Sequence, residues 1–479
     1  MPPAISLPAS ADYAALLPAF VVALVPLLIL FVDLFYRESG PWRRVVAAGL
    51  AIVWLIVAGV LQGLQYPHDY AAFGGAFVQG GFSIVFSEIV IVATIATLLL
   101  SLGVGRDDQV AGTTALLLWG ASGAMLMAGA ANLMTVFLGL ELLSLALYCL
   151  CAMSKRQTAR ESAIKYLVLS SMASGFLLYG SALLFGATGS VQFSALATAA
   201  VTPLLALGAG LFLVGLAFKL SLVPFHAWTP DVYEGAPLPI TAFMSVATKA
   251  GTLAVLARFA YAALPSGHRE AILLPLWVLA ALSMLVGNLG ALAQTDMKRL
   301  LAYSGIAQLG YIVVALAGTT ALGLRYALLY LAGYTFMNLG AFAVVALMSR
   351  DGDAVVALPR FAGLAHRRPW LAAAMTLFLI GLAGLPPTIG FTGKILILAA
   401  SVGAGYAWLG GVLIVGTAIS AYVYFKIVRV MFARVDPAHV RDERSGNPLP
   451  WIAVGVCAVA TFVLGLVPFT PSNVLPLVK

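Results

Sequence analysis

Long apolar runs follow one another along almost the whole chain, and only short polar segments separate them. A membrane-spanning helix needs about 20 apolar residues. Runs of that length lie at residues 14–34, 45–63, 82–104, 113–130, 132–152, 162–187, 204–222, 238–261, 271–293, 298–318, 324–349, 370–400, 404–432 and 449–471. No segment between them is long enough for a soluble domain. The pattern therefore predicts an all-α integral membrane protein with about fourteen transmembrane helices.

Composition and charge support a membrane location and predict an orientation. Of the 479 residues, 62% are hydrophobic and 9% are charged, which is too few charges to cover a soluble protein of this size. Seventeen of the 26 lysines and arginines lie after odd-numbered runs, three lie on the other side, and six lie within runs. Since positive loops favour the cytoplasmic side, we expect both termini on the periplasmic side of a bacterial inner membrane. The residues before the first run lack a basic region, so we interpret 14–34 as a retained helix.

Two of the predicted spans are interrupted by proline. The seventh ends at Pro224, and the twelfth contains Gly384-Leu385-Pro386-Pro387. Backbone groups freed inside a membrane must face protein or water, and paired broken helices are typical of inverted-repeat transporters. We expect one membrane domain, 1–479: three helices in 1–110, a first repeat in 111–261 (helices 4–8), a second in 271–432 (helices 9–13), and a last helix at 449–471.

Five of the ionisable residues within these spans are candidates for chemistry, since an ionisable group in the membrane costs about 2.5–3.5 kcal/mol. Glu141 is near the centre of the fifth span and Lys249 is deep in the eighth. Lys219 and Lys394 flank the two breaks, and Lys165 is about one turn inside the sixth span. Burial disfavours the charged form of a lysine and a nearby carboxylate favours it, so a row of such groups can pass a proton.

Each of these residues also has a simpler interpretation. A lysine can extend its ammonium to the headgroups, most readily Lys165 and least readily Lys249. The same applies to Arg258 and Lys426 near span ends. Glu141 can form a purely structural ion pair.

His226, in the broken seventh span, has two interpretations that the sequence does not separate. It can relay protons, because histidine titrates near neutrality, or it can hydrogen-bond carbonyls freed beside Pro224. The sequence contains no phosphate-binding glycine loop, metal-ligand cluster or nucleophile elbow. We therefore expect no metal, cofactor or hydrolytic site in this chain.

The longest motif surrounds the seventh-span break, from Phe218 to Pro237. It resembles the signature of the antiporter-like membrane subunits of respiratory complex I, the NADH–quinone oxidoreductase. Its ending, Asp231-Val232-Tyr233-Glu234-Gly235-Ala236-Pro237, is similar to the subunit N branch of that family, the counterpart of mitochondrial subunit 2. Shorter matches lie at 139–144, 164–166, 296–304 and 384–394.

The resemblance implies a proton-translocating subunit with fourteen helices and two inverted five-helix repeats. Glu141 would pair with Lys219, Lys249 would be the central relay, and Lys394 would lead to the outlet. Lys165 matches a sixth-span lysine of the family.

The resemblance also implies that cofactors lie elsewhere in the complex and that partners are membrane proteins. NADH, FMN, iron–sulfur clusters and quinone would belong to other subunits. The partners would be the antiporter-like subunits M and L, small membrane subunits and the lipid bilayer, with no nucleic acid. Two alternatives are a subunit of a multisubunit Na⁺/H⁺ antiporter or membrane-bound hydrogenase, and a passive membrane scaffold. Lys249 argues against the scaffold, since no residue near it in sequence neutralises it.

Overall fold

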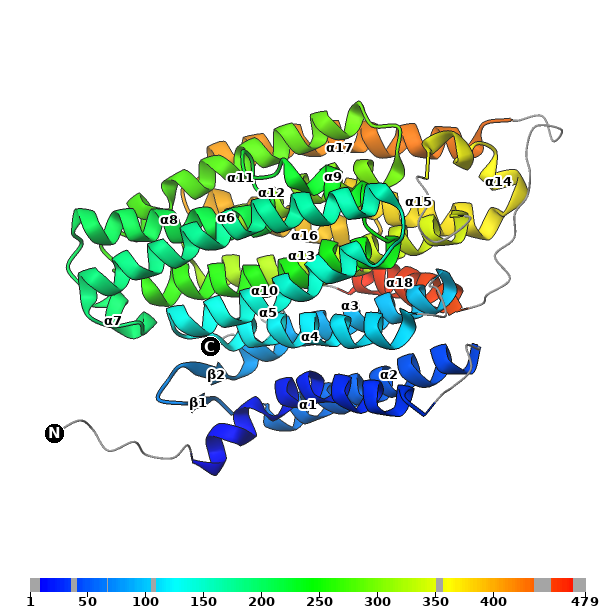
Figure 1. Ribbon diagram of the computed structural model, residues 1–479. Helices are drawn as coiled ribbons and strands as arrows, with labels where there is room; N and C mark the ends of the chain where they lie inside the picture. The colour runs from blue at the N-terminus through cyan, green and yellow to red at the C-terminus, as the bar shows by residue number, and fades with distance from the viewer. Residues whose placement is uncertain are drawn as a thin grey trace.

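The chain folds into a bundle of long helices that run roughly parallel or antiparallel to one another (Figure 1). The computed structural model describes residues 9–35, 41–66, 68–104, 109–349, 356–434 and 449–467. Both chain ends lie outside the described residues. So do six of the basic residues on which the orientation prediction rests: Arg37, Arg106, Arg350, Arg441, Arg444 and Lys479.

The helices are α1 (Ser10–Asp33), α2 (Pro41–Gln65), α3 (Gly81–Val104), α4 (Val110–Gly129), α5 (Leu133–Ala152), α6 (Gln157–Thr188), α7 (Phe193–Ala197), α8 (Pro203–Leu220), α9 (Trp228–Gly235), α10 (Leu238–Arg258), α11 (Arg269–Leu292), α12 (Met297–Ala315), α13 (Ala321–Met348), α14 (Leu364–Arg367), α15 (Pro369–Ala383), α16 (Ile389–Gly403), α17 (Ala407–Phe432) and α18 (Leu449–Leu466). A π-helical turn, Phe259–Ala263, extends α10, and a 3₁₀ turn covers Leu358–Phe361. Two strands, β1 (Tyr70–Ala72) and β2 (Phe77–Gln79), lie between α2 and α3.

The predicted all-α membrane fold is confirmed, and the described helices can be matched to the fourteen predicted spans. Twelve of the described helices are long and apolar enough to cross a membrane. The shorter apolar helices α15 and α16 together form the broken twelfth span. The more polar α12, which begins Met297-Lys298-Arg299, completes the fourteen.

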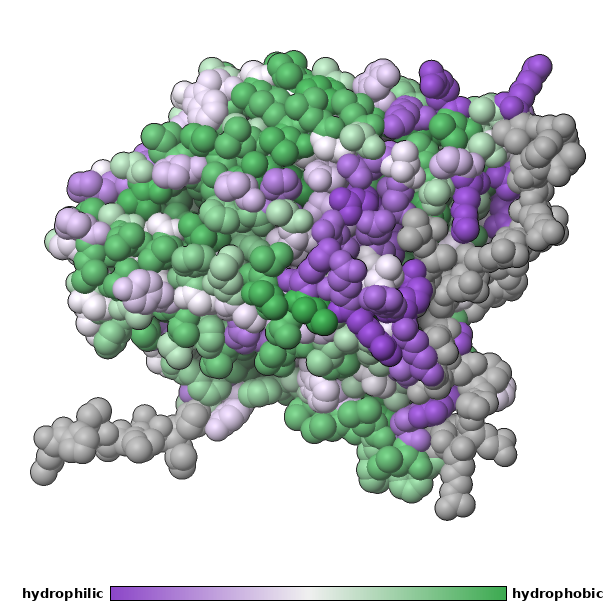
Figure 2. All heavy atoms as spheres, turned by 45° about the horizontal axis from the view of Figure 1, so that its top comes forward, coloured by the Kyte–Doolittle hydropathy of each residue, from purple (hydrophilic) through white to green (hydrophobic). Residues whose placement is uncertain are grey.

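The β-hairpin was not predicted. β1 and β2 pair antiparallel, with Tyr70 opposite Gln79, and Gly74 and Gly75 turn the chain with positive φ. The adjacent glycines were the sequence signal, since a tight hairpin needs positive φ. The hairpin marks one end of the bundle, which we call the hairpin end (Figure 1). Hydrophilic residues gather toward the opposite end, which we call the basic end (Figure 2).

Both predicted breaks are present, and they share a local geometry. α8 ends at Ser221 with φ 60°, and α15 ends at Gly384 with φ 82°. A left-handed residue commonly terminates a helix. A proline follows each one three positions later, Pro224 and Pro387, where it cannot continue the helix. The peptide bonds before these prolines are cis.

Helices four to eight and nine to thirteen of the span count pack in matching ways. α4 packs on α5 and α10, as α11 packs on α12 and α17. α6 packs on α8, as α13 packs on α15 and α16. α10 lies at the centre against α3, α4 and α13, and every residue of it except Arg258 is buried. The two halves therefore meet at α10 and α13.

Candidate functional site

The break after α8 exposes backbone carbonyls that need hydrogen-bond donors, because the last carbonyls of a helix have no partner within it. Trp228 Nε1 donates to the Phe218 carbonyl at 3.0 Å. Lys249 Nζ donates to the Lys219 carbonyl at 2.6 Å. A side chain of α10 thus satisfies the end of α8.

Lys249 lies in the middle of α10 and is only 3% exposed. Its ammonium also donates to Ser221 Oγ at 2.6 Å and sits 5.1 Å from the centre of the Trp228 ring. Among the described residues it has no carboxylate within ion-pair distance. Its partners are a carbonyl, a hydroxyl and an aromatic face, all neutral. Because Lys249 lies in the middle of α10 and its ammonium is held by these buried groups, it does not extend to the headgroups.

Lys219, 2% exposed, points from α8 into a cage of hydroxyl groups. Its Nζ donates to Ser144 Oγ and Ser170 Oγ at 2.7 Å each, and to the Tyr166 hydroxyl at 3.3 Å. The ring of Tyr166 also faces the ammonium, with Nζ 5.0 Å from its centre. Hydroxyls can both donate and accept, so this cage suits either protonation state of the amine.

Glu141 does not form the direct ion pair with Lys219 that the family resemblance implied. No salt bridge of 4 Å or less joins them in the described structure, and Glu141 Oε1 is buried without a hydrogen-bond partner there. Ser144, nearly one turn along α5, occupies the contact with Lys219 instead. Any influence of the carboxylate on Lys219 therefore acts through space.

The amines of Lys219 and Lys249 are linked through one residue. Lys219 supplies its side chain to the hydroxyl cage and its carbonyl to Lys249. The charges of the two side chains act on each other, and like charges repel more strongly in a low-dielectric interior than in water. Placing a proton on one therefore disfavours placing a second on the other, which is the property a transfer step needs.

The second break repeats the capping of a carbonyl by lysine. Lys394, 3% exposed, lies in α16, and its Nζ donates to the carbonyls of Leu382 at 3.0 Å and Ala383 at 3.1 Å. The ammonium sits 4.5 Å from the centre of the Tyr311 ring. A Cβ at Gly384 would lie 2.6 Å from Lys394 Cδ, so glycine is needed there for close approach as well as for its φ.

A buried hydrogen-bonded cluster lies next to Lys394. Gln308 Nε2 donates to the same Leu382 carbonyl at 2.9 Å and to the Tyr424 hydroxyl at 3.1 Å. Gln308 Oε1 accepts from the Tyr330 hydroxyl at 2.5 Å. The hydroxyls of Tyr424 and Ser304 are 2.5 Å apart. One carbonyl thus connects Lys394 to four further polar side chains.

A stripe of polar residues on α13 reaches from this cluster toward Lys249. Tyr330, Tyr334 and Asn338 are four residues apart, so they lie along one face of the helix. Asn338 Nδ2 donates to Ser245 Oγ at 2.6 Å, and the Tyr334 hydroxyl donates to the Ser245 carbonyl at 3.3 Å. Ser245 lies one turn before Lys249 on α10. All five side chains are buried.

These neutral polar residues were not predicted from the sequence. The search there was for charged groups, whereas hydroxyls and amides within apolar runs are common and often only bond their own helix. The available signal was the four-residue spacing of Tyr330, Tyr334 and Asn338 within an apolar run. Which helix they face could not be read from it.

Lys165 lies apart from the buried amines. Its side chain is 43% exposed and pairs with Glu161 at 2.8 Å and Asp231 at 3.3 Å. Arg299 bridges Asp231 at 2.7 Å and Glu234 at 2.8 Å. Burial alone would raise the pKa of Asp231, but hydrogen bonds from Arg299 and Lys165 outweigh it and hold that pKa below its usual range. These five residues, which we call the charged rim, tie α6, α9 and α12 together.

His226 lies between α8 and α9 and is half-buried. Its Nδ1 is buried and has no hydrogen-bond partner within the described ranges, while the imidazole as a whole interacts with the Pro224 backbone, as the second interpretation expected. Its ring meets that of Tyr303 edge-on, with centroids 6.5 Å apart. In the part of the chain that the structure describes, no group of three or more His, Cys, Asp or Glu residues could hold a metal ion.

Comparison with known proteins gives consistent results. Residues 130–420 match the family model described as NADH:quinone oxidoreductase/Mrp antiporter, TM. NADH-quinone oxidoreductase subunit N 1 of Symbiobacterium thermophilum is 42% identical over 98% of this chain and 99% of its own length. Subunit N of Chloroflexus aggregans is 38% identical over 95% of each chain.

Solved structures give the same fold. A chain of respiratory complex I from Thermus thermophilus with bound aureothin is 36% identical, covers 95% of this chain and 97% of that one, and superposes with a TM-score of 0.81. A chain of the Mrp complex from Dietzia covers 96% and 95% with a TM-score of 0.85. At 22% identity, that second similarity shows the fold alone.

Proposed function

Because the chain belongs to the NADH:quinone oxidoreductase/Mrp antiporter family of membrane proteins, we propose that protons cross it along a row of buried amines, Lys219, Lys249 and Lys394. The chain is a proton-translocating membrane subunit of a bacterial NADH–quinone oxidoreductase, of the subunit N type. It couples quinone reduction elsewhere in the complex to proton transfer. The main observation in support of the proposed path is the hydrogen bond from Lys249 Nζ to the Lys219 carbonyl, at a helix break.

The first step of the path is an exchange between Lys219 and Lys249. The hydroxyl cage of Ser144, Tyr166 and Ser170 holds the Lys219 ammonium, and no described carboxylate forms a salt bridge with it. Electrostatic repulsion between the two ammonium groups favours one proton over two. A change in the charge of Glu141, whose Oε1 has no hydrogen-bond partner among the described residues, shifts the balance between them from a distance.

The second step runs from Lys249 to Lys394 through neutral groups. Ser245 and the α13 stripe lead from α10 to Gln308, which shares the Leu382 carbonyl with Lys394. Hydroxyl groups can pass a proton by donating one and accepting another, and water fills gaps between them. Lys394 then delivers the proton to the outlet.

We assign the charged rim to the mouth of the path on the first half of the chain. Lys165 precedes Tyr166, whose hydroxyl contacts Lys219, so the rim and the hydroxyl cage are adjacent on α6. Lys165 thus keeps a place in the path at its exposed end. His226, whose Nδ1 has no described partner, is available as a relay beside Tyr303.

The division of the chain follows the same path. We place the first three helices in 1–110, the first repeat in 111–261, the second in 271–432 and the last helix in 449–471. The matching packing of α4 with α5 and of α11 with α12 supports this division. The excess of basic residues at the basic end supports a cytoplasmic location for it, with both termini periplasmic.

Within the complex, the chain lies among membrane subunits and lipid. We propose subunits M and L and the small membrane subunits as its neighbours. We also propose that NADH, FMN, the iron–sulfur clusters and quinone bind to other subunits. The chemistry of the buried side chains, amines and hydroxyls around two helix breaks, suits proton transfer rather than redox chemistry.

The decisive experiment replaces Lys249 with Met in the assembled complex. NADH-driven quinone reduction and proton pumping are then measured together in sealed vesicles. We expect pumping to be lost, because Met fills the space but carries no proton. Lys426→Met is the matched control, since Lys426 is a partly buried lysine of α17 whose one hydrogen bond to a described residue is to the Leu292 carbonyl. Normal pumping with Lys249→Met would support the passive-scaffold alternative for this chain. Repeating the pumping measurement without Na⁺ distinguishes proton transport from sodium transport.

A further inference from the structure

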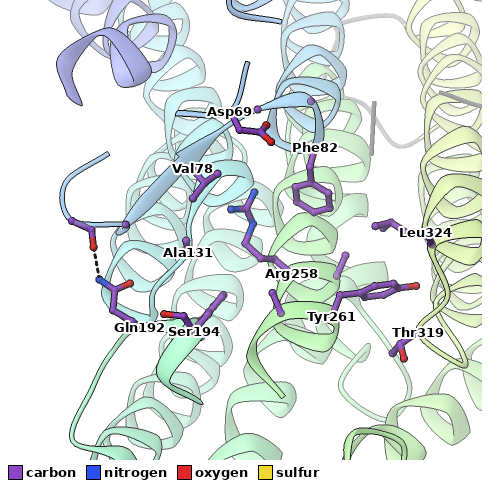
Figure 3. A pocket seen from close by; sticks show the side chains of 18 of the residues that line it. Asp69, Val78, Phe82, Ala131, Gln192, Ser194, Arg258, Tyr261, Thr319 and Leu324 are labelled. Atoms are coloured by element: carbon purple, nitrogen blue, oxygen red, sulfur yellow. Dashed lines mark hydrogen bonds between the residues drawn. The ribbon is translucent and has the colours of Figure 1, made fainter. Parts of the chain in front are cut away.

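A large cavity opens at the hairpin end, away from the buried amines (Figure 3). Its volume is about 870 Å³, and it lies between the hairpin, the first turns of α3 and α13, and the last turn of α10. Arg258, which lines it, is nine residues beyond Lys249, or about 14 Å along α10 and on the opposite face. The cavity is therefore separate from the proposed proton path.

The cavity contains a guanidinium group with unused hydrogen-bonding capacity. Arg258 points into it, with its guanidinium carbon 4.9 Å from the centre of the Phe82 ring (Figure 3). Its single described hydrogen bond is long, 3.5 Å to the Ala128 carbonyl, and no described carboxylate lies within ion-pair distance. Since a guanidinium has five N–H donors, most remain free for an anion. The first residues of α3 and α13, Gly81 and Ala321, line the same cavity and add the positive ends of two helices.

A carboxylate lines the same cavity from the exposed side. Asp69 precedes β1, and Figure 3 shows its side chain turned into the space that Arg258 enters. It makes no hydrogen bond or ion pair of 4 Å or less with any described residue, although its negative charge acts on Arg258 across the cavity. Its carboxylate packs directly on Gly80, where a Cβ would lie 1.8 Å from Asp69 Oδ1. The cavity thus offers a cation in its interior and an anion at its rim.

Size and depth favour a lipid headgroup over a free ion. Cavities of about 300–1,000 Å³ hold organic ligands, and a single phosphate would leave this one largely empty. The ends of membrane-spanning helices lie at headgroup level. Tyr66 and Tyr261 also line the cavity, and tyrosine is enriched at that depth.

We propose that this cavity binds the headgroup of phosphatidylethanolamine, with its phosphate on Arg258 and its primary ammonium on Asp69. Phosphatidylglycerol has the phosphate but no cation for Asp69. Phosphatidylcholine has a cation but no N–H to donate to it. The pair of charges therefore selects one headgroup among three, independently of the proposed proton path.

The test measures the association of nitroxide-labelled phosphatidylethanolamine, phosphatidylglycerol and phosphatidylcholine with the purified, assembled complex by electron spin resonance. We expect the wild type to prefer the ethanolamine lipid. Arg258→Gln should weaken its binding about tenfold, on the scale of a lost charged hydrogen bond. Asp69→Asn should remove the preference over phosphatidylglycerol. Arg258→Lys, which keeps the charge, should retain most binding, and Arg325→Gln is the control at the same end of the bundle.

Three results would overturn the proposal. The first is equal binding of all three lipids by the wild type, or unchanged preference in Arg258→Gln. The second is displacement of the labelled lipid by inorganic phosphate, which would make the site one for free anions. The third is loss of a neighbouring subunit from Arg258→Gln, on native gels, with lipid preference intact, which would assign the cavity to an acidic side chain of a partner.

Discussion

The two helix breaks of this chain share one backbone geometry, but the lysine that caps each break comes from a different part of the fold. In each, a left-handed residue ends the helix, a proline follows three positions later, and the carbonyl two residues before the left-handed one accepts a lysine ammonium. In the first break the lysine comes from a separate, continuous helix, and the carbonyl belongs to a second lysine. In the second break the lysine comes from the other half of the same span, and the carbonyl belongs to Leu382. The first break couples two titratable groups, and the second holds one.

The residues that end the two helices, Ser221 and Gly384, also differ, because only the first contributes a side chain to its site. Ser221 adopts a left-handed conformation that costs a non-glycine residue about 1–2 kcal/mol. Its hydroxyl accepts hydrogen bonds from Lys249 and Thr229, at 2.6 Å each. Gly384 has no side chain to offer, and its place is filled by the aliphatic part of Lys394. Strain is tolerated at the break where the side chain participates in the site.

The largest effect is expected from a double-mutant cycle at the first break. Lys219→Met and Lys249→Met should each reduce pumping by at least about tenfold, and the double variant should be no worse than either, because coupled groups act as a unit. Proton pumping in sealed vesicles, relative to NADH oxidation, measures this. If the losses of pumping in the two single variants multiplied in the double variant, the two lysines would not exchange a proton. The first break would then no longer differ from the second by coupling two titratable groups.

The second largest effect is expected at Gly384. Gly384→Ala introduces a Cβ at φ 82° and 2.6 Å from Lys394 Cδ, so we expect the free energy of unfolding to fall by at least about 1–2 kcal/mol, and pumping to fall with it. Thermal unfolding of the assembled complex and vesicle pumping measure the two effects. Gly411→Ala is the control, because a Cβ there meets nothing within 4 Å. Equal tolerance of both changes would contradict the packing described for Lys394.

An intermediate effect is expected from Gln308, the neutral connection to the second break. Gln308→Leu leaves the buried Tyr330 hydroxyl without its described partner, at a cost of about 1–3 kcal/mol, whereas the Tyr424 hydroxyl keeps its contact with Ser304. We expect slower pumping with Lys394 still in place. Tyr330→Phe, which removes one hydroxyl, should give a smaller decrease. Full pumping in both variants would show that protons reach Lys394 by another route.

A smaller effect separates strain from hydrogen bonding at Ser221. Ser221→Gly removes the left-handed strain and the hydroxyl, whereas Ser221→Ala removes only the hydroxyl. The Ala variant should therefore be about 1 kcal/mol less stable than the Gly variant by thermal unfolding. Both should pump more slowly than the wild type, since Lys249 loses the same acceptor. A Gly variant with wild-type pumping would exclude the hydroxyl from the path.

The smallest effect concerns acid stability at the charged rim. The pKa of Asp231 lies below its ordinary value of 3.8, so its ion pairs stabilise the fold fully above that pH. That contribution disappears as pH falls through the lower, folded-state pKa. The stability difference between the wild type and Asp231→Asn should be constant near neutrality and vanish in acid. A difference that instead grows on acidification would reverse the sign assigned to the shift.

Much of this fold was predictable because lipid imposes strong constraints on sequence. Run length located the fourteen spans, and proline located both breaks, since neither feature depends on which helices touch. The burial of Lys219, Lys249 and Lys394 followed from their depth within runs. The hairpin was missed because it is a short polar element between two strong apolar patterns.

The partners of those side chains could not be predicted. Glu141 and Lys219 lie at compatible depths, yet Ser144 makes the contact, because helix rotation decides which residue of a turn faces a neighbour. Arg258 was expected to extend to the headgroups from a span end; it points into a cavity at that end of the bundle, whose lining the sequence did not indicate. The link from Lys249 to Lys394 through Ser245, Asn338 and Gln308 depends on three separate helix–helix orientations, none of which a single sequence specifies.

Because Lys249 hydrogen-bonds the Lys219 carbonyl, the protonation of Lys249 can affect the backbone of α8. If Lys249 gave up its proton on the proposed path and its neutral amine turned away from α8, the Lys219 carbonyl would lose its donor and the last turn of α8 would loosen. When the proton returned, that turn would be clamped again. On the proposed path, the arrival of a proton would change the backbone stiffness at the end of α8, beside α10, the helix that meets the second half of the bundle.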